Sequence, residues 1–233
     1  MRERDGSPGS SARTPAYTET NYAVRGPLVR WLRSEAARAG EGTRILDVGC
    51  GVKPYEPFFR PYASYVGVDV GNPAADLEGA AEDLPVDDGS FDLVLCTQTL
   101  EHCLDPARAV RELRRVVAPG GRVLASTHGV QVYHPAPEDL WRWTHAGLER
   151  LFTENGEWSA MRVQPGSGTT ACVAMLAAYY VHHVAERSRM PALGRIVISA
   201  LNRGAEAIDG RSDLLRSARP GTIHANYHVT AEP

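Results

Sequence analysis

The chain has 233 residues, of which 43% are hydrophobic and 23% are charged, and its formal net charge is -3. This length suits one large domain with its own core, and a weakly acidic chain without a basic block is not expected to bind nucleic acid. The four cysteines include no Cys-x-x-Cys pair, which indicates free thiols in a reducing, cytoplasmic compartment.

The N-terminal region precedes the first strong motif. Residues 1–16 offer little to bury and are expected to form a disordered leader, followed by a single domain over residues 17–233. Neither a signal peptide nor a transmembrane span is predicted. From about residue 20 to 39, apolar side chains recur at helical spacing. This helix is predicted either to pack on the core or to cap a ligand crevice, with Tyr17 and Tyr22 facing the substrate.

The central motif is residues 44–51, with the sequence RILDVGCG. Its apolar residues predict a parallel strand that is covered on both faces. Gly49 and Gly51 allow a sharp turn and a close approach to a ligand, and Pro54 suits the first turn of a following helix. A strand, a glycine turn and a helix N-terminus form the usual crevice for a nucleotide-like ligand. A tight turn without a ligand is the alternative.

The next predicted strand, residues 65–70, contains an acid close to its end. Asp69 lies 22 positions after Asp47. An acid about 20 residues beyond the glycine turn is placed to bind a ribose diol, because one carboxylate accepts hydrogen bonds from both hydroxyls. The alternative is a carboxylate that is held only by water.

Further elements follow in regular order. Strands are predicted within residues 76–86 and at 91–96, 122–127, 158–163 and 223–229, with helices after Asp105 and Thr144, which are both good N-caps. Residues 133–144 are too proline-rich for regular structure. Helices at 169–184 and 193–208 form an insertion over residues 168–217. This insertion is interpreted as a lid, a dimer interface or a membrane-surface contact, although the last would need more lysine and arginine.

Several short motifs occur together: Leu46–Gly51, Val68-Asp69, Glu82–Pro85, Ser90–Asp92, Leu100–His102 and Leu113–Gly121. In order and spacing they resemble the class I S-adenosylmethionine-dependent methyltransferases of the broad type 11 kind, over roughly residues 43–155. The pattern from His134 to Thr144 is similar to a bacterial subgroup. The resemblance implies an α/β, Rossmann-like fold with a seven-stranded, mostly parallel sheet, helices on both faces and an antiparallel last strand.

The resemblance also implies S-adenosylmethionine as cofactor and a set of cofactor-binding residues. Asp47, Gly49, Cys50 and Gly51 are expected at the methionine end, Asp69 at the ribose, Ala81 and Glu82 at the adenine, and Cys96, Thr97 and Gln98 near the sulfonium and amino-acid part. Two positions depart from the family pattern. Lys53 stands where a third glycine is common, and Ala80 replaces an acid, so the hydrogen bond of that acid to the adenine amine is expected to be either missing or supplied by Glu82 or Asp83.

Candidate catalytic residues follow the fourth and fifth strands. Methyl transfer is an in-line displacement for which the protein mainly aligns the nucleophile. A hydroxyl acceptor usually needs a general base, and histidine suits this near neutral pH. His134 and His102 are the candidates. Asp139 is predicted to hold an amine or to orient His134, and Tyr133 to stack on the acceptor or hydrogen-bond it.

Two further residues of this segment are candidates for substrate binding. Trp141 is predicted to contact the substrate, with packing against the sheet as the alternative for it and for Trp143. Arg142 is predicted to meet a phosphate or carboxylate of the substrate, or to pair with Glu138 or Asp139. No metal site is predicted, because the sequence shows no zinc-like ligand spacing.

These observations predict a methyltransferase (EC 2.1.1.-) that acts on nitrogen or oxygen of a small molecule. A secondary metabolite or a sugar-containing compound is the expected acceptor, with a role in natural product biosynthesis. The predicted partners are this acceptor and a second copy of the chain, without nucleic acid or stable membrane insertion. The alternatives are a cofactor-binding partner subunit without turnover and an NAD(P)-dependent oxidoreductase, which the missing third glycine disfavours.

Overall fold

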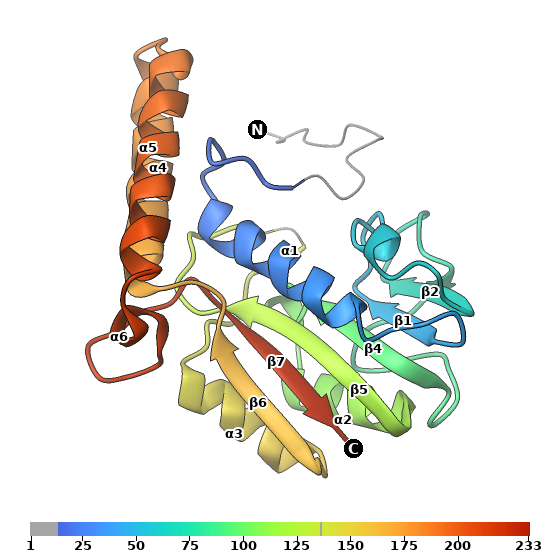
Figure 1. The fold of residues 1–233 in the computed structure, drawn as a ribbon. Helices are drawn as coiled ribbons and strands as arrows, with labels where there is room; N and C mark the ends of the chain where they lie inside the picture. The colour runs from blue at the N-terminus through green and yellow to red at the C-terminus, as the bar shows by residue number, and fades with distance from the viewer. Residues whose placement is uncertain (1–13, 136) are drawn as a thin grey trace.

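The computed structural model describes residues 14–135 and 137–233, so most of the predicted leader lies outside the described residues. A seven-stranded sheet with the order β3-β2-β1-β4-β5-β7-β6 organises the chain (Figure 1). Its strands are β1 (Arg44–Val48), β2 (Ser64–Asp69), β3 (Leu77–Glu78), β4 (Phe91–Thr97), β5 (Val117–His128), β6 (Ala160–Pro165) and β7 (Asn226–Glu232). Strand β7 runs antiparallel to β5 and β6, whereas β1 to β5 pair in parallel. This confirms the predicted fold class.

Helices cover both faces of the sheet (Figure 1). Helix α1 (Tyr22–Ala36) buries Leu28, Trp31 and Leu32 against one face. Helices α2 (Pro106–Val116) and α3 (His145–Asn155) bury their apolar residues against the other. Both N-caps were predicted correctly, because the side chains of Asp105 and Thr144 accept backbone hydrogen bonds from the first turns.

A short helix follows the glycine turn near residues 54–59, as predicted. It is the 3₁₀ helix η1 (Glu56–Phe58), which begins two residues after Pro54, and turns surround it. Pro57 and Pro61 follow closely, and each lacks the amide donor that an α-helix would need. This crevice therefore has no long helix pointing its N-terminus at a ligand.

The predicted helical pair lies between β6 and β7. Helices α4 (Thr169–Arg187) and α5 (Pro191–Asp209) run side by side as a hairpin that extends beyond the sheet, and α6 (Asp213–Arg216) follows at its base (Figure 1). The base of α4 packs on α1 through Cys172 and Met175. No helix in the described ranges is long and apolar enough to cross a membrane. The lid, dimer and surface-contact roles remain predictions.

Candidate active site

The strand order places a crevice beside β1. The chain runs outward from β1 to β2 and β3, then returns to β4 on the other side of β1. At such a reversal the loops from the two directions separate, so open α/β sheets bind ligands at this point, outside the carboxyl ends of their strands. The glycine turn after β1, Asp69 at the end of β2, and the loops after β4 and β5 all belong to this edge.

The glycine turn is tight at one glycine and open at the other. Gly49 has φ +68°, and a Cβ atom there would lie 2.3 Å from Thr99 Oγ1, so only glycine fits. Gly51 has φ +53° and open space where a side chain would be. Lys53, which replaces the third glycine, keeps the left-handed conformation with φ 53°, and its ammonium lies 2.5 Å from Asp76. Lys53 thus adopts the left-handed conformation that glycine favours.

Asp69 joins the turn to the end of β2. One carboxylate oxygen, Oδ2, accepts hydrogen bonds from the Gly51 amide at 2.9 Å and from Asn72 Nδ2 at 2.8 Å, and Oδ1 accepts one from the Val70 amide. The carboxylate is half-exposed and held by protein donors. It is therefore presented at a fixed position next to the open space at Gly51.

Asp47 and the two cysteines are less accessible. The Asp47 side chain is buried and accepts a hydrogen bond from the Tyr65 hydroxyl at 2.7 Å. Burial raises the pKa of Asp47 to about 7. Burial likewise raises the pKa of the Cys50 thiol to about 12. The side chain of Cys96 packs in the hydrophobic core, so only its backbone can face a cofactor.

Thr97 and Gln98 end strand β4 at the same edge. Thr97 is buried, and Gln98 has φ 55°. The amide of Gln98 donates to the Ser126 carbonyl, and its Nε2 donates to Ser126 Oγ at 2.9 Å. Its Oε1 is buried without a hydrogen-bond partner among the residues described. A buried acceptor without a donor costs free energy, so a donor from a bound molecule would stabilise it.

The adenine-side residues have partners within the chain. Ala81 is buried, and Glu82 Oε1 lies 3.3 Å from the Asp105 amide at the start of α2. Asp83 is exposed and lies 3.7 Å from Arg108. Both acids therefore have partners already, and an adenine amine would have to compete with the Asp105 amide for Glu82 or with Arg108 for Asp83.

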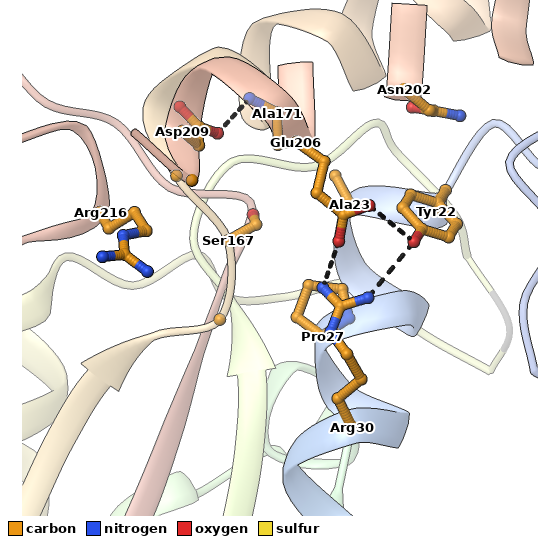
Figure 2. A pocket seen from close by; sticks show the side chains of 13 residues that line it. Tyr22, Ala23, Pro27, Arg30, Ser167, Ala171, Asn202, Glu206, Asp209 and Arg216 are labelled. Atoms are coloured by element: carbon orange, nitrogen blue, oxygen red, sulfur yellow. Dashed lines mark hydrogen bonds and ion pairs between the residues drawn. The ribbon is translucent and has the colours of Figure 1, made fainter. Parts of the chain in front are cut away.

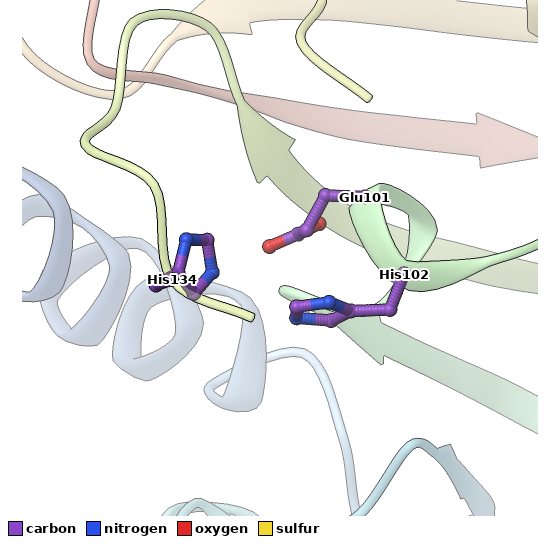
Figure 3. A group of neighbouring side chains, drawn as sticks. All are labelled: Glu101, His102 and His134. Carbon is purple, nitrogen blue, oxygen red and sulfur yellow. The ribbon is translucent and has the colours of Figure 1, made fainter. Parts of the chain in front are cut away.

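A second group of polar side chains lies where β4 and β5 end. Glu101 and His102 belong to the 3₁₀ helix η2 (Leu100–His102), and His134 follows β5. Figure 3 shows the three side chains directed toward a common space. One possible ligand atom from each lies within 4.8 Å of the others. The fold thus brings together both predicted base candidates and a carboxylate.

Glu101 is the buried member of this group. Its Oε2 accepts a hydrogen bond from Thr127 Oγ1 at 2.8 Å, and its Oε1 lies 3.2 Å from His128 Nε2 without hydrogen-bond geometry. Burial raises the pKa of Glu101 to about 7 and lowers the pKa of His128 to about 3.

The two histidines are each held through one ring nitrogen. His102 Nδ1 hydrogen-bonds the Glu138 carbonyl, and His134 Nδ1 lies 3.2 Å from the Val132 carbonyl and 3.4 Å from Asp139 Oδ2. Because these carbonyls accept hydrogen bonds, Nδ1 carries the proton in the neutral rings. Nε2 of both rings is then the basic nitrogen, and it has no hydrogen bond in the described part of the chain.

Asp139 anchors the irregular segment. Both of its oxygens accept hydrogen bonds from the Arg142 guanidinium, at 2.5 and 2.7 Å, and Oδ2 also accepts one from the His134 amide at 3.0 Å. The guanidinium holds the pKa of Asp139 well below its usual range. The predicted pairing of Arg142 with Asp139 is present, and Asp139 is placed to orient His134.

The aromatic residues of this segment divide into two groups. The Tyr133 side chain is 76% exposed and projects from the surface. Trp143 packs against the hydrophobic core, as predicted for at least one of the tryptophans. Trp141 stacks on Trp143 and donates from Nε1 to the Cys103 carbonyl at 2.8 Å, but remains partly exposed.

Tyr22 lines a different pocket, and Tyr17 shares its contact with Glu206. Their hydroxyls donate to Glu206 of α5 at 2.5 and 3.1 Å. Figure 2 shows Tyr22 and Glu206 in a pocket of about 290 Å³ between α1, the loop before α4, and α5. The two tyrosines thus tie the N-terminal segment to the hairpin, and their contact with a substrate remains a prediction.

Two residues of the site had no predicted role. Glu101 stood in a quoted motif, but the 3₁₀ turn that directs its side chain inward has no sequence signal. His128 at the end of β5 was not singled out, although a histidine at the carboxyl end of a parallel strand is a usable signal.

Comparison with known proteins agrees with this geometry. Residues 46–125 match the family described as a methyltransferase domain. Residues 46–125 belong to a class I S-adenosylmethionine-dependent methyltransferase domain. The predicted family is confirmed, and S-adenosylmethionine is the cofactor of this methyltransferase family.

Two bacterial relatives match less than half of this chain. A ubiquinone biosynthesis O-methyltransferase of Pseudomonas aeruginosa is 35% identical over 119 residues, which cover 42% of this chain and 49% of that protein. A malonyl-[acyl-carrier protein] O-methyltransferase of Erwinia pyrifoliae is 39% identical over 105 residues, covering 40% of each. The chain thus spans about half the length of these relatives.

A solved structure shows the same fold over nearly the whole chain. It is a putative methyltransferase from an antibiotic biosynthesis pathway of Anabaena variabilis, with a TM-score of 0.53 and 16% identity. It covers 96% of this chain and 100% of its own. At this identity the likeness concerns the fold alone.

The residues at the glycine turn fit the family's cofactor. The open space at Gly51, the presented carboxylate of Asp69 and the buried acceptor Gln98 Oε1 are groups that a polar nucleoside could use. The roles predicted for the individual residues remain predictions.

Proposed function

We propose that this chain transfers a methyl group from S-adenosylmethionine to an oxygen or nitrogen of a small molecule. The observation that carries the proposal is the group of Glu101, His102 and His134 at the carboxyl edge that also holds the glycine turn. A bound acceptor there would meet basic nitrogens beside the methyl donor. A secondary metabolite or a sugar-containing compound remains the proposed acceptor class.

Oxygen is the acceptor atom that this site favours. A neutral amine can attack without losing a proton first, whereas a hydroxyl is a weak nucleophile until a base removes its proton. Basic nitrogens at the acceptor side are therefore more useful for a hydroxyl. The names of the two bacterial relatives, which are both O-methyltransferases, support the same choice.

The reaction needs alignment and one proton acceptor. The cofactor supplies an activated methyl group on sulfur. The acceptor oxygen forms a bond to the methyl carbon as the carbon–sulfur bond breaks, and that electron pair stays on sulfur. His134 is oriented to receive the hydroxyl proton at Nε2, because its Nδ1 side is held by Val132 and Asp139. Asp69 and Gln98 would hold the cofactor.

Turnover is the direct test of this proposal. The purified chain is incubated with S-adenosylmethionine and a panel of hydroxylated small molecules, and formation of S-adenosylhomocysteine is followed by mass spectrometry. His134→Ala is expected to lower turnover with a hydroxyl acceptor by 10²-fold or more, whereas His183→Ala on the exposed face of α4 is the matched control. Full turnover in the His134→Ala variant would refute the role of this segment.

Two further properties are proposed with this function. All four cysteines are buried and free, which supports a cytoplasmic, reducing compartment. Exposed apolar side chains on the hairpin, including Tyr180 and Ile196, support a homodimer. Gel filtration with light scattering tests the dimer. A chain that is still monomeric at about 100 µM, a concentration at which even a weak dimer should form, would contradict it.

A further inference from the structure

We propose that Glu101, His102 and His134 form a binding site for a divalent transition-metal ion, with Zn²⁺ as the ion that fits the ligand set best. The first observation is the convergence of two imidazoles and one carboxylate, whose possible ligand atoms lie within 4.8 Å of one another (Figure 3). Two histidines and one glutamate are a recurrent ligand set of catalytic zinc sites.

A second, independent observation concerns Glu101. Its side chain is fully buried, and Oε1 has no hydrogen-bond partner in the described part of the chain. The other oxygen, Oε2, is already held by Thr127. An acceptor that is both buried and unsatisfied is unfavourable unless a bound group completes it. A cation coordinated by Oε1 would supply that missing interaction.

The histidines are arranged as metal ligands usually are. A metal-binding histidine typically donates the proton of its other ring nitrogen to a carbonyl or carboxylate, which fixes the ring and its tautomer. His102 Nδ1 is held by the Glu138 carbonyl, and His134 Nδ1 faces the Val132 carbonyl and the Asp139 carboxylate. Both rings thus keep Nε2 as the nitrogen with a free lone pair.

The surrounding charges allow a cation. Arg142 is paired with Asp139 through two hydrogen bonds. Tetrahedral Zn²⁺ with bonds of about 2.1 Å places its ligand atoms roughly 3.4 Å apart, so ligand atoms that lie up to 4.8 Å apart must approach by up to about 1.4 Å. His134 lies on irregular backbone, which adjusts more readily than a strand.

Such a site would have an open coordination position. Three protein ligands leave room for a water molecule or a substrate oxygen. If the proposed function is correct, His134 Nε2 is occupied by the metal when the ion is bound, so the cation takes over the activation of the acceptor hydroxyl, because a bound cation lowers the pKa of coordinated oxygen and the proton then leaves to solvent. Only this last step rests on the proposed function. The metal site itself does not require methyl transfer.

Metal binding to the purified chain tests the site. The protein is treated with chelator, desalted and dialysed against Zn²⁺, and the bound metal is measured by mass spectrometry. Co²⁺ is then titrated as a visible-absorption probe. The expected result is one ion per chain, with affinity lowered at least tenfold by His134→Ala and by His102→Ala. His183→Ala, an exposed histidine on α4, is the control that keeps full affinity.

The outcomes separate the metal site from the proposed function. No stoichiometric Zn²⁺ in the unmodified chain, or unchanged affinity in His134→Ala, overturns the metal site. Circular dichroism verifies that each variant is folded, and the conservative Glu101→Gln variant tests the carboxylate without removing its volume. Titration with S-adenosylhomocysteine is measured separately. Zn²⁺ binding without binding of that ligand would keep the metal site and remove the proposed function.

Discussion

Replacing Asp47 by asparagine should stabilise the folded chain at alkaline pH. The Asp47 carboxyl is buried with the Tyr65 hydroxyl as its hydrogen-bond donor. Burial raises its pKa from 3.8 to about 7. Between these two pH values the folded chain holds a proton that the unfolded chain releases, so the free energy of unfolding falls as the pH rises. Above pH 7 the folded state carries a buried negative charge.

The magnitude follows from the two pKa values. Each pH unit between them is worth about 1.4 kcal/mol, so ionisation of Asp47 lowers the free energy of unfolding by about 4 kcal/mol at pH 8. Asparagine has nearly the same shape, its carbonyl oxygen can accept the Tyr65 hydrogen bond, and it does not ionise. The stability difference between Asp47→Asn and the unmodified chain should therefore grow from near zero at pH 4 to about 4 kcal/mol at pH 8.

Urea denaturation at pH 4, 6 and 8 measures this difference. Asp92→Asn is the matched control, because Arg44 holds the pKa of Asp92 below its usual range. A carboxylate of that kind stabilises the folded state at high pH and loses its effect as the pH falls, so this variant should be destabilised at pH 8. A stability difference for Asp47→Asn that does not change with pH, or a loss at pH 8, would refute the reasoning.

Two further predictions concern packing and the irregular segment. Gly129→Ala should lower the free energy of unfolding by about 1–3 kcal/mol, because the new Cβ would lie 2.4 Å from the His224 carbonyl. Gly42→Ala, which has open space, should be neutral in the same urea denaturation. Asp139→Asn should cost about 1.5–3 kcal/mol and speed proteolysis within residues 133–144, since it breaks the ion pair with Arg142. Asp213→Asn removes an exposed ion pair with Arg216 and should leave the cleavage rate of residues 133–144 unchanged. Equal cleavage rates in the two variants would contradict the anchoring role of Asp139.

The sequence predicted those parts of the fold that local rules determine. Strand β1 and the turn at Gly49 follow from apolar residues and a left-handed backbone. The starts of α2 and α3 follow from N-cap side chains, and the α4–α5 hairpin follows from helical periodicity. The short helix expected near Pro54 is present, but only as one 3₁₀ turn, because nearby prolines remove amide donors that a longer helix would need.

The site depends on contacts that local rules do not specify. Glu101 and His134 lie on separate segments, and only the pairing of β4 with β5 brings them to one edge. Spacing along the sequence therefore gave no sign of a metal site. The Tyr17 contact with Glu206 likewise joins segments that are far apart in the sequence, which no local rule predicts. The substrate role of Tyr17 stays a prediction.

Binding of the cofactor tests the central claim most directly. The purified chain and its Asp69→Ala variant are titrated by calorimetry with S-adenosylmethionine, S-adenosylhomocysteine and NADH. We expect micromolar binding of both sulfur ligands, a loss of at least 10-fold in affinity on removing Asp69, and no heat with NADH. Binding of NADH alone, or equal affinity of the variant for S-adenosylhomocysteine, would contradict a cofactor site built on the glycine turn and Asp69.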